Sequence, residues 1–138
     1  MKAYLDSSVI LRILLEQPHP LEEFQKYEER IGSELLEVEC LRTLDRMRLT
    51  GELTEEQNIE FRSALFQSLQ SMNLLSLSPA ILRRASGPFP VVLGTLDAIH
   101  LSTAIAWKDA MGDDLVIATH DKSLGKAAMA LGFKIEGV

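Results

Sequence analysis

Short apolar runs alternate with longer segments of helical periodicity along the chain. The apolar runs predict buried strands, at residues 2–5, 74–77, 114–119 and 133–135. Capping residues, prolines and glycines bound the segments between them and predict helices, at residues 7–15, 21–30, 34–49, 54–71, from 79 onward, 95–111 and 122–131. Strands separated by helices and apolar enough to be covered on both faces indicate a parallel α/β sheet with right-handed crossovers.

Composition is that of one ordinary globular domain. The chain has 138 residues, of which 46% are hydrophobic and 25% are charged, so we expect a single domain over residues 1–138. No apolar run approaches the roughly 20 residues of a membrane span, and no cleavable signal begins the chain. We therefore expect a cytoplasmic protein without a membrane partner. The single cysteine, Cys40, is expected to be a small buried residue.

Carboxylates follow two of the predicted strands. Asp6 comes after residues 2–5, and Asp121 comes after residues 114–119. Ligands of open α/β sheets bind at the carboxyl ends of the strands, which makes both acids candidates for a functional site. Each acid also has a structural interpretation as a helix N-cap. Asp97 stands in the first turn of an apolar helix, where it would also complement the helix dipole.

Four short segments carry a more specific signal. They are Tyr4-Leu5-Asp6-Ser7-Ser8, Val38-Glu39-Cys40-Leu41-Arg42, the run TLDAIHLSTA at 95–104, and Thr119-His120-Asp121-Lys122-Ser123-Leu124. In content and order they resemble the four motifs of PIN-domain ribonucleases, in particular the VapC-type toxins. The resemblance implies a PIN-like α/β/α sandwich around a central, mainly parallel sheet of four to five strands.

The resemblance also implies a set of site residues. Asp6, Glu39, Asp97 and Asp121 match the acidic quartet that binds Mg²⁺ or Mn²⁺ in that family. Ser7, Ser8 and Thr119 match supporting polar positions near the first and last acids. Periodicity alone does not select Glu39, because Glu34 and Glu37 lie on the same predicted helix, which is apolar almost all round.

Converging carboxylates have a physical requirement of their own. Two such charges about 4 Å apart repel by roughly 4 kcal/mol at an effective dielectric constant near 20, so a cluster must protonate, separate or bind cations. Oxygen ligands favour hard ions such as Mg²⁺ and Mn²⁺, which suit phosphodiester hydrolysis by a metal-activated water. The net charge of −6 argues against a surface tuned as a whole to nucleic acid but does not exclude a local site.

The function implied by the resemblance is that of an Mg²⁺- or Mn²⁺-dependent endoribonuclease. Its expected role is that of the toxin of a type II, VapBC-like toxin–antitoxin system, with RNA as substrate, a cognate antitoxin as partner and a homodimer as assembly. Basic residues near the acids are candidates for substrate binding by position, namely Arg12, Arg42, Arg46, Lys122 and Lys126.

Three other interpretations remain open from the residues. Asp97, His100 and His120 allow a mixed site for Zn²⁺ or Fe²⁺. A phosphatase of the haloacid dehalogenase type also places an aspartate after its first strand, but it needs a second acid where this chain has Ser8. A catalytically inactive PIN domain that only binds protein or RNA is the third.

Overall fold

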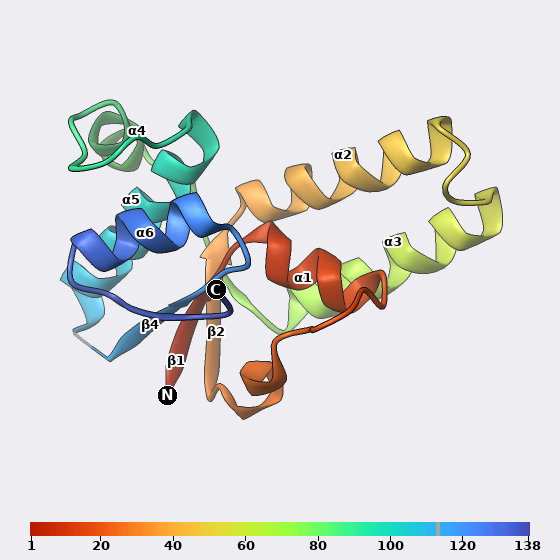
Figure 1. Cartoon of the computed structure of the whole chain (residues 1–138), viewed down its shortest axis with the longest axis horizontal. Helices are drawn as coiled ribbons and strands as arrows, with labels where there is room; N and C mark the ends of the chain where they lie inside the picture. Colours follow the sequence, from red (N-terminus) through yellow and green to blue (C-terminus); the bar gives the residue numbers. More distant parts are fainter. Residues whose placement is uncertain (113) are drawn as a thin grey trace.

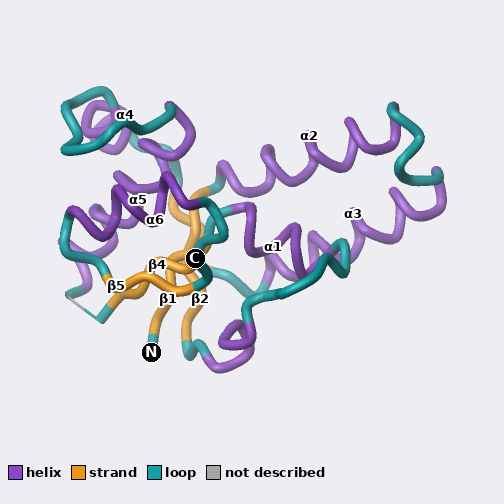
Figure 2. Tube along the Cα trace, viewed as in Figure 1, coloured by secondary structure: helices purple, strands orange, loops and turns teal. Residues whose placement is uncertain are grey.

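The computed structural model describes residues 1–112 and 114–138 and contains a central sheet of five parallel strands. Their spatial order is β3-β2-β1-β4-β5 (Figures 1 and 2). The strands are β1 (Lys2–Leu5), β2 (Glu29–Ser33), β3 (Asn73–Leu75), β4 (Leu115–Ala118) and β5 (Lys134–Glu136). The chain therefore starts in the middle of the sheet, builds one side with β2 and β3, and then crosses to the other side. This reversal makes the junction of β1 and β4 the topological switch point, where α/β proteins bind their ligands.

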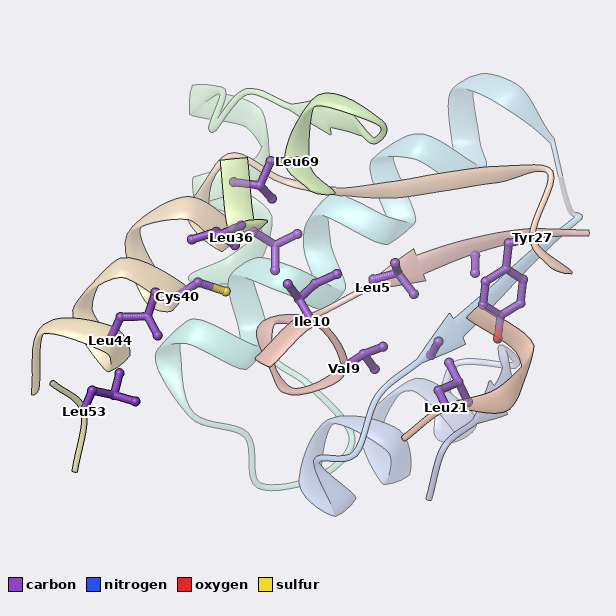
Figure 3. Close-up of a cluster of buried hydrophobic side chains, with 13 residues drawn as sticks. Leu5, Val9, Ile10, Leu21, Tyr27, Leu36, Cys40, Leu44, Leu53 and Leu69 are labelled. Carbon is purple, nitrogen blue, oxygen red and sulfur yellow. The ribbon is translucent and has the colours of Figure 1, made fainter. Parts of the chain in front are cut away.

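Helices cover both faces of this sheet. They are α1 (Ser7–Leu14), a short 3₁₀ helix η1 (Glu22–Lys26), α2 (Leu35–Leu49), α3 (Glu55–Gln70), α4 (Pro79–Ala85), α5 (Thr95–Met111) and α6 (Lys122–Ala130). The pleat of β1 divides the core in two. Ala3 and Leu5 belong to a cluster with α1, α2 and α3 (Figure 3), whereas Tyr4 belongs to a second cluster with α5 and α6. The α/β/α sandwich and its parallel five-stranded sheet agree with the sequence prediction.

Helices α2 and α3 form an antiparallel hairpin that extends beyond the end of the sheet (Figure 1). Helix α3 starts at a capping box: the Gln57 amide donates to Thr54 Oγ1, and the Gln57 side chain accepts from the Thr54 amide. Buried Leu36, Leu44 and Leu65 join the hairpin to the first core cluster. Packing against α3 thus positions α2 beside α1.

One predicted helix is wrong. Residues 21–30 were expected to be helical up to a break at Gly32, but they form η1 and the beginning of strand β2. Strand β2 is stabilised by pairing with β1 and β3, which are distant in sequence and therefore invisible to local periodicity. Gly32 of this strand leaves room for Leu36, since a Cβ at this position would stand 2.6 Å from Leu36 Cδ1 and that side chain would have to move. The other elements match their predictions within a few residues.

No helix in the described residues is both long enough and apolar enough to cross a bilayer.

Candidate active site

A hollow of about 410 Å³ lies at the carboxyl ends of β1 and β4. Its lining residues are Asp6, Ser7, Ser8, Glu39, Gly94, Thr95, Leu96, Asp97, His100 and Asp121. The four carboxylates expected from the motif resemblance therefore meet at one place, although they come from four separate parts of the chain. Asp97 lies in the first turn of α5 and Asp121 is the N-cap of α6, where helix dipoles favour negative charge.

Asp6 is held by hydroxyl groups. It is the N-cap residue of α1, yet its side chain makes no capping hydrogen bond, so the helix-cap interpretation does not describe its carboxylate. Ser8 Oγ donates to Asp6 Oδ1 at 2.6 Å, and Thr119 Oγ1 donates to Asp6 Oδ2 at 2.8 Å. Asp6 is 4% exposed, and burial raises the pKa of its carboxyl above the ordinary value while the two hydroxyls oppose that rise.

Strand pairing explains why these groups meet. Leu5 lies opposite Ala118 in the parallel register of β1 and β4, so the next residues, Asp6 and Thr119, leave the sheet side by side. Thr119 Oγ1 also accepts a hydrogen bond from the Asp121 amide at 2.9 Å. The buried Thr119 hydroxyl consequently connects the first acid of the site to the backbone that carries the last one.

Asp121 acts as both helix cap and site acid. Its Oδ1 accepts from the amides of Ser123 at 2.8 Å and Leu124 at 3.2 Å, which fixes the side chain over the start of α6. Asp121 also lines the hollow. The two interpretations left open by the sequence are therefore compatible at this position.

Glu39 is held by a buried chain of hydrogen bonds. His100 Nε2 lies 2.5 Å from Glu39 Oε1, and His100 Nδ1 lies 2.7 Å from the Tyr4 hydroxyl. Burial raises the pKa of the Tyr4 hydroxyl well above its ordinary value, so Tyr4 stays protonated. An ionised Glu39 only accepts, so in a neutral imidazole the proton is on Nε2 and Nδ1 accepts from the Tyr4 hydroxyl. The proton on Nε2 then points to Glu39. Because His100 is 1% exposed and Tyr4 is fully buried, this chain gives the Glu39 carboxylate a fixed position.

The pKa of Asp97 shows how the acids of the cluster affect one another. Burial raises its pKa to about 6, with further upward contributions from Asp121 and Asp6 and an opposing one from His100. The acids are thus near enough to disfavour one another's ionised form. A cation in the hollow would reverse this effect.

The donor set fits a hard divalent cation. The four acids offer only oxygen, the ligand type that Mg²⁺ and Mn²⁺ prefer. Within residues 1–112 and 114–138, no three Asp, Glu, His or Cys side chains are drawn together closely enough to hold a metal ion by themselves. A divalent cation bound there would take water or phosphate oxygens in addition to carboxylates, as Mg²⁺ usually does in proteins.

The mixed histidine site for Zn²⁺ or Fe²⁺ is not favoured. Both ring nitrogens of His100 are engaged, with Glu39 and Tyr4. His120 directs Nδ1 to the backbone carbonyl of Gly137 at 2.8 Å and does not line the hollow. Cys40 is buried, and burial raises the pKa of its thiol to about 12, as expected for a small core residue rather than a ligand or nucleophile.

The basic candidates separate into two groups. Arg12, Arg42 and Arg46 line hollows next to the acidic one. Lys122 and Lys126 are exposed on α6 and line none of these hollows. The sequence analysis did not identify Tyr4 as a residue that supports the site. The available signal was the alternation of side chains along β1: Tyr4 lies on the opposite face from Ala3 and Leu5 and therefore points towards α5 rather than α1.

The parallel sheet, with acids gathered at the switch point between β1 and β4, defines an α/β protein with an oxygen-rich site at the carboxyl ends of its strands. A family model described as the PIN domain matches residues 3–129. The chain therefore belongs to the PIN-domain family.

Similar proteins support this placement. The chain is 31% identical over 137 residues to Ribonuclease VapC46 of Mycobacterium tuberculosis (strain ATCC 25618 / H37Rv), covering 96% of this chain and 94% of that protein. VapBC2 from Rickettsia felis, solved with a DNA fragment from its promoter, has a similar fold: the TM-score is 0.66 at 16% identity, over 99% of this chain and 98% of that one. A toxin–antitoxin complex from Klebsiella pneumoniae gives a TM-score of 0.64 at 15% identity, over 88% of each chain.

The raised pKa of Asp97 predicts a pH-dependent stability. A carboxyl whose pKa is higher in the folded than in the unfolded chain binds its proton more tightly in the folded state, so stability falls as the pH rises through about 6. In metal-free buffer, Asp97→Asn should raise the free energy of unfolding at pH 7 by about 1 to 2 kcal/mol, allowing for solvent screening, and flatten this pH dependence. Urea unfolding at several pH values measures both effects. The matched control is Asp109→Asn, an exposed acid of the same helix, and equal behaviour of the two variants would contradict the prediction.

The Thr119 hydroxyl gives a second prediction. Thr119→Val removes the donor to Asp6 and the acceptor for the Asp121 amide, and should cost about 2 to 3 kcal/mol of unfolding free energy. Thr119→Ser keeps the hydroxyl and loses only a methyl group, for a cost of about 1 kcal/mol. Denaturation at pH 7 compares the two, and a serine variant as unstable as the valine variant would show that the hydroxyl is not responsible.

The buried hydrogen bonds that link Tyr4, His100 and Glu39 give a third prediction. His100→Ala should lower the affinity for Mn²⁺ by about 10- to 100-fold, because the carboxylate loses its fixed orientation. Tyr4→Phe, which leaves the imidazole in place, should have a smaller effect. Calorimetric titration of the folded variants measures both affinities. Glu37→Gln, an exposed neighbour on α2, serves as control, and a His100→Ala affinity equal to that of the control would contradict the prediction.

Proposed function

We propose that this chain is an Mg²⁺- or Mn²⁺-dependent endoribonuclease and acts as the toxin of a type II, VapBC-like toxin–antitoxin system. The observation that carries the proposal is the meeting of Asp6, Glu39, Asp97 and Asp121 in one hollow at the switch point of a PIN fold. Its similarity to Ribonuclease VapC46 over nearly the whole chain supports RNA as the substrate.

The proposed reaction is hydrolysis of a phosphodiester bond. The bound cation would supply a water of lowered pKa and neutralise charge that develops on the phosphate and the leaving oxygen. Water oxygen attacks phosphorus, the bond to the 3′ oxygen breaks, and the products are a 5′-phosphate and a 3′-hydroxyl. The acids bind the cation, and Ser8, Thr119 and His100 hold two of those acids in place.

The other open interpretations have less support. Ser8 occupies the position where a haloacid dehalogenase-type phosphatase needs its second acid, and its hydroxyl donates to Asp6 instead. An inactive PIN domain has no need to keep four acids in one hollow against their mutual repulsion. Both observations favour a working metal-dependent site.

The proposed partners follow from the similar proteins. VapBC2 and the Klebsiella pneumoniae complex are named as toxin–antitoxin structures, which supports a cognate antitoxin for this chain as well. A homodimer and a cytoplasmic location are part of the same proposal. Size-exclusion chromatography with light scattering tests the dimer.

Cleavage assays test the proposed activity. The protein should cut RNA with Mg²⁺ or Mn²⁺, lose activity with a chelator, and regain it when the metal is restored. Asp6→Asn and Asp97→Asn should each lower the rate by roughly 100-fold or more, because each removes a proposed metal ligand.

The matched control is Asp109→Asn, which removes an exposed acid from the same helix as Asp97 and should leave the rate unchanged. Sequencing the 5′ ends of the cleaved RNAs identifies the target. Metal-independent cleavage, or full activity in both site variants, would overturn the proposal.

A further inference from the structure

The acidic hollow continues into a trough between α1 and α2. A second hollow, of about 310 Å³, shares Ser7, Glu39 and Leu96 with the acidic one. A third, of about 390 Å³, shares Thr43 and Arg46 with the second. We refer to the second and third hollows together as the α1–α2 trough. The three hollows are thus adjacent and lead from the acids along α1 and α2.

Charge changes sign along this path. Glu39, Arg42 and Arg46 lie at helical positions i, i+3 and i+7 of α2, so they share one face and span about 10 Å of the helix axis. Arg12 of α1 lines the trough from the opposite wall. The carboxylate of the site is therefore followed by three arginines, until Glu52 at the far end reverses the charge again.

The arginines are available to a ligand. Arg46 is exposed and forms no ion pair with any residue that the structure describes. Arg42 pairs with Asp45 at 3.1 Å, but its side chain is 71% exposed, and such a pair contributes little. Among residues 1–112 and 114–138, Arg12 makes only a long contact, 3.4 Å, with the His19 carbonyl. The guanidinium group has the geometry to bind phosphate oxygens in pairs.

We propose that the α1–α2 trough binds the single-stranded RNA next to the bond that is cut, with its phosphates on Arg46, Arg42 and Arg12. The inference rests on the proposed function and names how that site holds its substrate. In a protein of net charge −6, this arginine row supplies attraction for a polyanion directly beside the acids. Exposed Val38 and Leu96 line the same trough and provide apolar contact for unstacked bases, which a single strand presents and a duplex does not.

Salt-dependent binding tests the trough without catalysis. In an Asp97→Asn background, a fluorescent single-stranded RNA is titrated at salt concentrations from about 50 to 200 mM. Removing one phosphate contact should lower the slope of log affinity against log salt by about 0.7, so the affinity ratio between those salt concentrations shrinks about 2.6-fold for each arginine lost. Arg46→Ala and Arg12→Ala should each show this change, and the double variant twice the change in slope. Arg46→Lys should keep the slope because the charge remains.

Arg83→Ala is the matched control, since Arg83 is an exposed arginine of α4 that lines none of the three hollows. Slopes for Arg46→Ala and Arg12→Ala equal to that of Arg83→Ala would overturn the inference. The inference would also be overturned if Arg46→Ala and Arg12→Ala abolished binding of an acidic protein but left RNA binding unchanged, because the trough would then be a protein-docking surface.

Cleavage by the otherwise wild-type chain separates this inference from the proposed function. Arg46→Ala should raise KM for a long RNA by a larger factor than KM for a dinucleotide, because the dinucleotide is too short to follow the whole trough. If cleavage depends on metal but the arginine variants have no effect, the inference about the trough is wrong and the proposed nuclease function stands. Arginine-dependent RNA binding without any cleavage would overturn the nuclease proposal and leave the trough as an RNA-binding surface.

Discussion

The parallel pairing of β1 with β4 is the interaction on which the rest of the site depends. These strands lie more than 100 residues apart in the sequence, and their register sets Leu5 opposite Ala118. Asp6 and Thr119 then leave the sheet at the same edge and form a buried hydrogen bond of 2.8 Å. A register shift of one residue would turn either side chain to the other face of the sheet, so strand pairing and site geometry are specified together.

Around this point the protein holds acids together against their repulsion. Hydroxyl donors from Ser8 and Thr119 offset part of the cost of burying Asp6. The hydrogen bonds from Tyr4 through His100 likewise offset part of the cost of burying Glu39. No residue in the described part of the chain donates a side-chain hydrogen bond to Asp97, and burial together with its neighbours raises its pKa to about 6. Hydrogen bonds thus hold Asp6 and Glu39 in place, while the acids disfavour one another's ionised form, an effect that a bound cation would reverse.

Most elements of the fold were predictable from the sequence, and the exception is informative. Alternating apolar runs and capping signals located the strands at residues 2–5 and 114–119 and the helix that starts after Thr54. Residues 29–30 were assigned to a helix and strand β2 was missed, because its partners on β1 and β3 are distant in the sequence. Asp6 and Asp121 were identifiable as strand-end acids, but Glu39 was indicated only by its motif and not by periodicity.

The sequence by itself determined the order of the elements, the acids at the ends of two strands and the motifs that identify the family, because these depend on residues close together in the chain. Only the tertiary structure decided that Glu39 faces the site while Glu37 faces solvent, that Tyr4 supports Glu39 through His100, and that three arginines continue the acidic hollow into a trough. These features depend on strand register and helix packing, which join segments that no local pattern connects.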